Sequence, residues 1–255
     1  MTLINTIVSN YGLIQASDSN ITSPDSAEPT SGEKVFQLGF TNGALALAGT
    51  YGVGSQRMDT WMPSCISDYA ASPQPTLEGF ANYLKDRLDR ELTDRQKAGA
   101  TLIHVVGYVS GESGTHPEFY FVRNAATINE QTGAYEEIRD TFQVNEDFWT
   151  RDYNQPDARA AFDAGGYQTY FNGTPDGRIA FVQFGQIFGA FLQQVWSQPN
   201  WKFRAPQSLD ELASLVKLQI RTVGTLYEIS DYRAPFIGGE PQIERITPPD
   251  DAVTL

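Results

Sequence analysis

The order of apolar and polar positions in the first fifty residues predicts two β-hairpins. Each hairpin consists of two runs rich in apolar and β-branched side chains that flank a short turn. The second turn contains Asn42-Gly43, a dipeptide that strongly favours a hairpin. The polar segment between the hairpins, 19–33, contains two prolines and is predicted to be a loop. The four predicted strands are 2–9, 12–19, 34–38 and 44–50.

Apolar residues spaced three and four apart predict helices farther along the chain. In 76–93 they form one stripe on an otherwise charged segment. The segment 209–227 carries a similar stripe and begins with Ser208 and Glu211, which match the pattern of a capping box. The segment 181–196 is largely apolar and is predicted to be a buried helix. A further helix is predicted at 54–68, and strands at 100–109, 117–123, 134–144 and 242–247.

The predicted elements form blocks of strands flanked by blocks of helices, without an internal repeat or an evident linker. Such an order is typical of sheets packed face to face with helices outside. We therefore expect an α+β fold in a single domain that covers residues 1–255. Within it, 145–177 is rich in Asp, Asn, Gly and aromatic residues and is predicted to be an irregular insertion. The last residues, 248–255, are predicted to be a frayed tail.

The composition permits a sizeable core and argues against several classes of partner. Of 255 residues, 40% are hydrophobic and 19% charged, and the net charge of −13 repels nucleic-acid phosphates and anionic membrane lipid. One cysteine and two histidines are too few for a disulfide framework or for a Cys- or His-built metal site, and no cofactor is expected. Cys65 and His104 are predicted to be structural residues. No long apolar segment or secretory signal is evident, so a reduced, cytoplasmic location is expected.

Thr2 is the most informative candidate for chemistry because it directly follows Met1. Methionine is normally removed when the next side chain is as small as threonine. Its removal would leave a hydroxyl and a free α-amine on one residue. The hydroxyl is a weak nucleophile until a base takes its proton. An α-amine has an ordinary pKa of about 7.7–8.0, close to that of a useful base at neutral pH.

Two charged residues could tune this amine. Asp18 lies on the second predicted strand, and Lys34 opens the third. Side by side in a sheet, they would place an ammonium beside the N-terminal amine and favour its neutral, basic form. Asp18 would hold Lys34 through a charge-assisted hydrogen bond. Gly49, in a turn of small residues, could present a backbone N–H to the oxyanion that forms during attack on a carbonyl.

These residues resemble the proteasome β-subunit family of N-terminal nucleophile hydrolases, including the bacterial proteasome-like peptidases. The similarity is carried by Thr2, by ASDS around Asp18, by KVFQ starting at Lys34 and by LAG ending at Gly49. The resemblance implies a four-layer αββα sandwich of two antiparallel sheets flanked by helices. It also implies a threonine nucleophile at Thr2, an amine-tuning Lys34, an orienting Asp18 and an oxyanion donor at Gly49.

The comparison with this family also suggests supporting positions. Gln186 is the best match to a family serine that precedes the third helix. Ser230 and Asp231 are nearest to a family Asp and Ser pair after the last helix. The substrate pocket beside the scissile bond is expected at Ile21, Leu47 and Tyr51.

The leading hypothesis is a self-compartmentalising threonine endopeptidase that assembles into a homo-oligomeric ring. Its substrates would be peptides or unfolded proteins, with an ATP-dependent unfoldase as a candidate partner, and neither nucleic acid nor a membrane is expected. Two alternatives remain open. One is an amidase or acylase that uses the same nucleophile on a small amide. The other is a catalytically inactive ring or scaffold subunit that retains Met1.

Overall fold

The chain is an α+β protein built from antiparallel sheets and helices. The computed structural model describes residues 2–22, 28–112, 114–129, 131–132, 134–145, 155–164, 166–200, 202–231 and 236–252. The helices are α1 (Met58–Ala70), α2 (Leu77–Glu91), α3 (Asp94–Lys97), α4 (Pro156–Asp163), α5 (Pro175–Trp196) and α6 (Leu209–Glu228). The longer strands are β1 (Leu3–Ser9), β2 (Gly12–Ser17), β5 (Val35–Leu38), β6 (Gly43–Ala48), β9 (Leu102–Gly111), β10 (Gly114–Ile128), β11 (Tyr135–Asn145), β12 (Tyr167–Gly173) and β13 (Gln242–Ile246).

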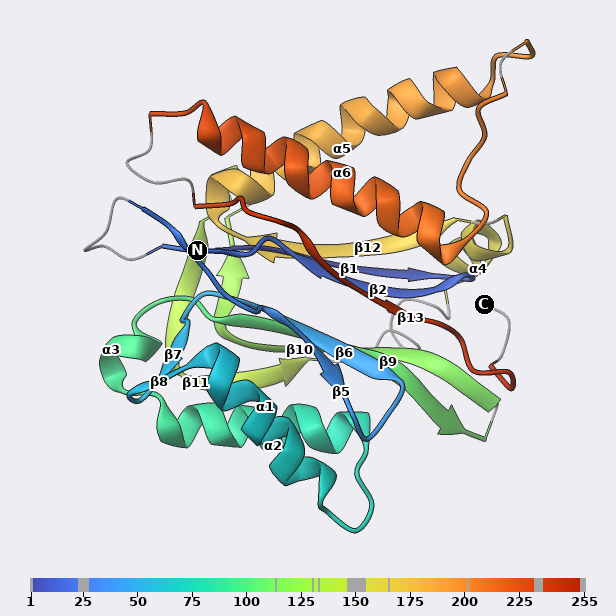
Figure 1. Cartoon of the computed structure of the whole chain (residues 1–255). Helices are drawn as coiled ribbons and strands as arrows, with labels where there is room; N and C mark the ends of the chain where they lie inside the picture. Colours follow the sequence, from blue (N-terminus) through green and yellow to red (C-terminus); the bar gives the residue numbers. More distant parts are fainter. Residues whose placement is uncertain are drawn as a thin grey trace.

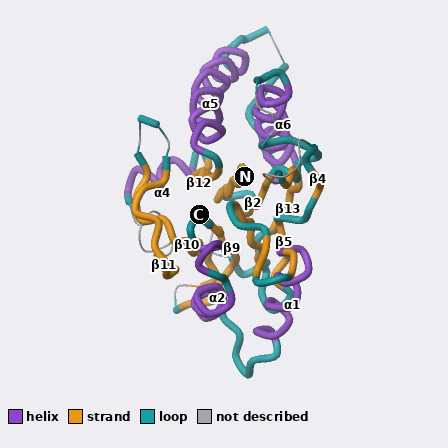
Figure 2. The backbone as a smooth tube through the Cα atoms, turned by 90° about the vertical axis from the view of Figure 1, so that its left-hand side faces the viewer, coloured by secondary structure: helices purple, strands orange, loops and turns teal. Residues whose placement is uncertain are grey.

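Two larger sheets face each other in the middle of the molecule. One has four strands in the order β12-β1-β2-β13, and the other has five in the order β11-β10-β9-β6-β5. In Figure 1, α5 and α6 lie above the four-stranded sheet, and α1 and α2 lie below the five-stranded sheet. The view in Figure 2 gives the same arrangement from the side. Helices therefore cover the outer faces, and the inner faces of the two sheets meet.

The two predicted hairpins are confirmed. In the first, β1 pairs with β2 and Ile4 lies opposite Ser17, and in the second, β5 pairs with β6 around the Asn42-Gly43 turn. The predicted loop between them contains two short strands, β3 (Asn20–Ile21) and β4 (Thr30–Ser31), which pair with each other. Residues 23–27 lie outside the described ranges.

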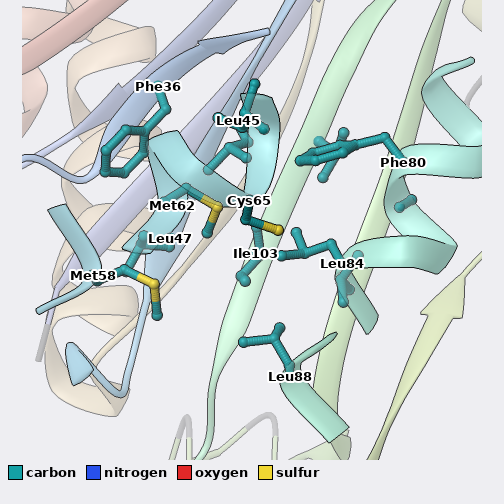
Figure 3. Close-up of a cluster of buried hydrophobic side chains, with 14 of the residues drawn as sticks. Phe36, Leu45, Leu47, Met58, Met62, Cys65, Phe80, Leu84, Leu88 and Ile103 are labelled. Atoms are coloured by element: carbon teal, nitrogen blue, oxygen red, sulfur yellow. The ribbon is translucent and has the colours of Figure 1, made fainter. Parts of the chain in front are cut away.

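The apolar stripe of α2 packs into the largest core cluster, beneath the five-stranded sheet. The helix begins where the Thr76 side chain accepts the Gly79 N–H at 3.0 Å, as a capping residue does. Phe80 and Leu84 are fully buried there against α1 and the sheet. Cys65 of α1 is also fully buried, as predicted, and burial raises the pKa of its thiol to about 12. Figure 3 shows these side chains together.

The stripe of α6 packs on the opposite sheet, against Leu3, Ile7 and Ile14 of β1 and β2. Its start follows the prediction only in part. The Ser208 side chain accepts the Glu211 N–H at 3.2 Å, but the Glu211 carboxylate accepts the backbone N–H of Gln207. The capping box is therefore incomplete, because its glutamate bonds one residue earlier than the pattern requires.

The predicted irregular insertion at 145–177 is wrong for the residues that the structure describes. It contains α4, the strand β12 and the start of α5, and β12 forms an edge of the four-stranded sheet by pairing with β1. Residues 146–154 and 165 lie outside the described ranges. Polar composition misled the prediction, because an edge strand that is half exposed can carry polar side chains on much of its length.

The predicted frayed tail begins too early. Asp251 accepts a hydrogen bond from the Thr115 hydroxyl at 2.9 Å, and Ala252 forms an isolated bridge with Thr115. The tail therefore contacts the start of β10 at least as far as residue 252. Residues 253–255 lie outside the described ranges.

The predicted burial of α5 is also wrong. Within this helix only Gly177 and Phe181 are buried, whereas Ile187 is 70% exposed and Phe191 57% exposed. The helix starts six residues earlier than predicted, at Pro175. The helix contacts β12 and α6, but Ile187 and Phe191 have little cover from the described part of the chain.

None of the helices in the described ranges has the length and apolar character that crossing a membrane requires.

Candidate functional site

Thr2 lies at the start of β1, where strands from both sides hold the backbone. It is 4% exposed, and its carbonyl oxygen accepts the Thr174 N–H at 3.0 Å. On the other side, the Asp18 N–H donates to the carbonyl of Leu3 at 3.3 Å. The first residues of β1 are therefore fixed between β12 and β2.

A buried ion pair lies directly beside this start. Lys34 Nζ is 3.1 Å from Asp18 Oδ1, and both side chains are essentially inaccessible to water. The same carboxylate oxygen accepts the Leu3 N–H at 2.9 Å. The ammonium and the amide that follows Thr2 thus share one oxygen atom. The predicted association of Lys34 and Asp18 is confirmed, and it lies next to Thr2.

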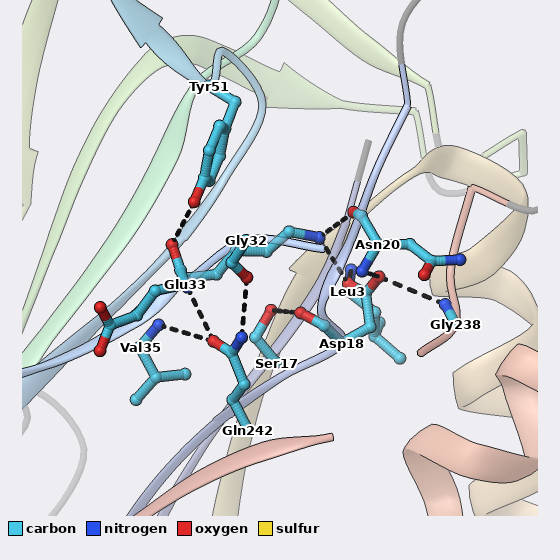
Figure 4. Close-up of polar contacts among 11 residues, drawn as sticks. Leu3, Ser17, Asp18, Asn20, Gly32, Glu33, Val35, Tyr51, Gly238 and Gln242 are labelled. Atoms are coloured by element: carbon cyan, nitrogen blue, oxygen red, sulfur yellow. Dashed lines mark hydrogen bonds and ion pairs between the residues drawn. The ribbon is translucent and has the colours of Figure 1, made fainter. Parts of the chain in front are cut away.

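The second carboxylate oxygen and the ammonium have further partners. Asp18 Oδ2 accepts the N–H groups of Asn20 at 3.1 Å and Gly238 at 3.3 Å, and Lys34 Nζ also donates to the Asn20 carbonyl. The Gln242 side chain accepts the Lys34 backbone N–H at 2.7 Å. Figure 4 shows how these contacts converge from the loop after β2, the segment before β5, the loop after α6 and β13.

The pair bridges the two sheets, which corrects the prediction that its members lie side by side in one. Asp18 directly follows β2 of the four-stranded sheet, and Lys34 directly precedes β5 of the five-stranded sheet. The sequence shows each hairpin as a local unit. It does not show that β5 joins the opposite sheet through β6 and β9.

Burial is the largest influence on the ionisation of both partners. It raises the pKa of the Asp18 carboxyl, against the opposing effect of Lys34 and of the N–H groups of Leu3 and Gly238. It lowers the pKa of the Lys34 ammonium, against the opposing effect of Asp18. Each charge therefore depends on its opposite partner, and the Asp18 charge depends also on the N–H groups that it accepts.

A cavity of about 460 Å³ opens beside Thr2. It lies within the size range of small-ligand sites. Its lining comes from Thr2 and from four other places in the chain: 48–50, 99–100 with Leu102, 134–135 with Ile138, and 173–175. The cavity therefore lies where the ends of both sheets meet.

Gly49 lines this cavity together with Thr2, as the prediction of an oxyanion contact requires. Its φ is +107°, a conformation that favours glycine, and a Cβ atom here would collide with the carbonyl oxygen of Ala100. Only a residue without a side chain fits, so its backbone can lie close to a group bound in the cavity.

Ile21, Leu47 and Tyr51, which were predicted to form the substrate pocket, do not line this cavity. Leu47 is 1% exposed and packs in the core under the five-stranded sheet. Ile21 is in β3, and the Tyr51 hydroxyl donates to the Glu33 carbonyl at 2.7 Å. Burial raises the pKa of Tyr51 above its ordinary value.

The three supporting positions are not part of the cavity lining either. Gln186 is exposed in the middle of α5 and does not precede a helix. The Ser230 hydroxyl donates to the Tyr227 carbonyl at 2.7 Å, and Asp231 is exposed just after it. The loop after α6 does approach the ion pair, but through the backbone of Gly238.

Sequence reasoning missed the segment before α5 and the tyrosine that contacts it. Thr174 caps α5 by accepting the Gly177 N–H at 3.1 Å, while its own N–H holds the Thr2 carbonyl. The Tyr135 hydroxyl accepts the Gly173 N–H at 2.9 Å. Thr174 and Pro175 precede an apolar run, a pattern that indicates the start of a helix. This pattern could have located the segment before α5 from the sequence.

His104 is the centre of a second buried polar group between the sheets. The Asn172 side-chain amide lies 2.8 Å from His104 Nε2, and the Thr6 hydroxyl lies 2.8 Å from Nδ1. An amide nitrogen can only donate, so these partners assign the ring proton to Nδ1. The Gln15 amide donates to the His104 carbonyl at 2.8 Å. Burial lowers the pKa of His104 to about 3, so the ring is neutral.

Within the described ranges, no three His, Cys, Asp or Glu side chains are grouped closely enough to hold a metal ion. No known family model and no curated protein sequence matches this chain.

The ion pair yields a prediction about stability. Lys34→Ala would leave the Asp18 charge buried without its partner, a change that typically costs about 3–5 kcal/mol of the free energy of unfolding. The control is Lys85→Ala, which removes a part-exposed ammonium 2.9 and 3.0 Å from two aspartates. We expect it to cost about 1 kcal/mol or less. Urea unfolding of the three proteins measures both values, and similar losses for both variants would contradict the prediction.

His104 yields a prediction about pH. The folded state keeps the ring neutral down to a pKa of about 3, whereas the unfolded chain takes up the proton near its ordinary value of 6.5. Stability therefore falls as pH decreases below 6.5. By linkage, this one group removes about 2 kcal/mol of the free energy of unfolding between pH 7.5 and pH 5.

The variant His104→Gln lacks this titration, while all other ionisable groups are retained. Urea unfolding at pH 7.5 and pH 5 should show that the stability gap between the wild-type protein and the variant narrows by that amount. A gap that is equal at both pH values would mean that His104 ionises alike in the folded and unfolded chains.

Proposed function

We propose that the chain is an N-terminal threonine hydrolase that cleaves peptide bonds, similar to the proteasome β-subunit family. The observation that carries this proposal is the position of Thr2. It lies at a cavity that Gly49 also lines, and the amide of the next residue shares a carboxylate oxygen with the Lys34 ammonium. The proposal requires that Thr2 carries a free α-amine in the mature protein.

The arrangement of the elements supports the same family. Two antiparallel sheets face each other, with α5 and α6 on one outer face and α1 and α2 on the other. We assign this arrangement to the four-layer αββα sandwich of N-terminal nucleophile hydrolases.

The proposed reaction begins when the Thr2 hydroxyl attacks the carbonyl carbon of a peptide bond. The Thr2 α-amine takes the hydroxyl proton, and the Gly49 N–H stabilises the oxyanion. The C–N bond then breaks, and the amine passes its proton to the leaving nitrogen. Water attacks the resulting ester, again with the α-amine as base, and releases the acid. As the ester bond breaks, the α-amine returns its proton to the Thr2 oxygen, which restores the free hydroxyl.

Lys34 and Asp18 support this chemistry without reacting. A cation near the α-amine lowers the pKa of that amine, so a larger fraction is in the basic form at neutral pH. Asp18 keeps the Lys34 ammonium in position and, by accepting the Leu3 N–H at 2.9 Å, orients the residue that follows the nucleophile. Thr174 holds the Thr2 carbonyl from the other side.

Assembly into a ring is the second part of the proposal, and the apolar surface of α5 supports it. Ile187 and Phe191 are more than half exposed, and the rings of Phe184 and Phe188 stack beside them. Apolar side chains gathered on one exposed helix are typical of contact surfaces between chains. A ring would enclose the Thr2 sites and restrict them to peptides or unfolded segments.

Activity depends on Thr2 in this proposal. Thr2→Ala should lower kcat/KM for fluorogenic peptides by at least about a thousandfold, because no other hydroxyl replaces the nucleophile. Thr30→Ala, in the exposed strand β4, is the matched control and should retain wild-type activity. Equal turnover by wild type and Thr2→Ala would eliminate Thr2 as the nucleophile.

Intact mass and N-terminal sequencing of the same samples complete this test. A mature chain that starts at Thr2 is required for activity, whereas retention of Met1 in its native host would favour the inactive scaffold. Turnover of simple amides without turnover of peptides would favour the amidase alternative.

Assembly has its own measurement. Light scattering should give a mass for the native protein that is several times the 28.2 kDa of one chain. Ile187→Asp should lower this mass, because it places a charge on the exposed apolar surface of α5. Gln186→Asp adds a charge at the neighbouring exposed position without removing apolar surface, so the assembly should persist. A monomer of the wild-type protein would refute the ring.

A further inference from the structure

The cavity beside Thr2 has a lining without charge. Among the described residues that line it, none is Asp, Glu, Lys, Arg or His. The polar members are threonines, glycine backbones and Tyr135, and the rest are small or apolar side chains. In a chain with a net charge of −13, such a surface is chemically distinct from the exterior.

We propose that this cavity binds one uncharged, apolar side chain of the substrate, and that Tyr135 and Ile138 of β11 determine this selectivity. The inference rests on the proposed function for its link to catalysis, but the binding it describes can be measured without turnover. It replaces the pocket predicted from sequence with one built by a different part of the chain.

Both β11 residues are held in position. Tyr135 lies opposite Ile128, and Ile138 lies opposite Ala125 in the pairing of β11 with β10. The Tyr135 hydroxyl also accepts the Gly173 N–H at 2.9 Å, which ties β11 to the segment beside Thr2. These restraints hold Tyr135 and Ile138 in place, so they cannot readily move apart to let water surround a bound charge.

The charged side chains near the cavity lie outside its lining. Glu136 and Glu137, between the two wall residues, are exposed; Glu136 accepts from the Asn129 amide at 3.1 Å, and Glu137 lies 3.7 Å from the Arg139 guanidinium. Arg178, in the first turns of α5, lies over the Phe171 ring at 5.7 Å, its buried Nε has no hydrogen-bond partner among the described residues, and its charge opposes the rise in the pKa of Tyr135 that burial causes. None of these side chains lines the cavity.

Desolvation is the reason for the expected selectivity. A carboxylate or ammonium that enters this cavity loses water and gains no opposite charge from its lining, which is unfavourable. An apolar side chain instead buries its surface against Ile138, Leu102 and the small residues around them. Substrates with leucine beside the scissile bond should therefore be favoured over those with glutamate or lysine.

The kinetic test compares fluorogenic amides that carry leucine, glutamate or lysine on the acyl side of the scissile bond. The wild-type protein should prefer leucine by at least about tenfold in kcat/KM. Ile138→Asp should reduce this preference about tenfold and improve lysine relative to leucine. Ile138 is 41% exposed, so the substitution is compatible with folding. Leu218→Asp, at a position on α6 that is 45% exposed, is the matched control and should leave the preference unchanged.

The binding test uses Thr2→Ala protein with labelled alanine methyl groups. N-acetyl-leucinamide should shift the Ala134 methyl signal by NMR, and the corresponding glutamate amide should not. Adding Ile138→Asp should weaken this shift, whereas adding Leu218→Asp should not.

Each outcome is decisive. Binding of the leucine probe without turnover by the wild-type protein would retain the cavity assignment and refute the proposed hydrolase. Turnover without preference for leucine, or an equal effect of Ile138→Asp and Leu218→Asp, would overturn the cavity assignment and leave the hydrolase intact. Absence of both binding and turnover would overturn both.

Discussion

Asp18 and Lys34 carry opposite charges into the space where the two sheets meet, and both are withdrawn from water there. Removing such charges from water is costly, and it is tolerated only when partners satisfy them. Asp18 accepts three backbone N–H groups, and Lys34 also donates to a backbone carbonyl. These partners belong to β1, β3 and the loop after α6. The hydrogen bonds and the ion pair of Asp18 therefore fix the start of β1 relative to both sheets. Apolar contacts lack direction and would fix this position less specifically.

The outer and inner faces of the sheets are stabilised by different interactions. The outer faces pack against apolar stripes on α2 and α6. The inner faces also hold directed hydrogen bonds around His104, which join β9 to β1, β2 and β12. Asn172, a member of this group, is followed by Gly173, which contacts Tyr135 at the cavity. The polar interior thus extends from the middle of the sheets to the cavity beside Thr2.

Local patterns in the sequence predicted the hairpins and helices well. They failed for features that depend on contacts between segments far apart in the chain. The hairpins follow from the Asn42-Gly43 turn and from runs of apolar and β-branched residues, and the stripe of α2 from its spacing. The pairing of Asp18 with Lys34 was also predicted, although not that it crosses between sheets. The cavity could not be predicted, because Tyr135 and Gly173 reach Thr2 through strand order. The exposure of α5 was missed because apolar composition does not specify what covers a helix.

Gly49 and Gly173 have a consequence for recognising diverged relatives. A Cβ atom at Gly49 would collide with the carbonyl of Ala100, and one at Gly173 with the carbonyl of Thr2. The atoms in the way belong to the main chain, so a substitution at a neighbouring position would not remove them. We therefore expect glycine to be retained at both positions in related chains. Together with Asp18 and Lys34, these positions form a sparse template of four residues at set intervals. Such a template can be searched in genomes where full-length similarity has already faded.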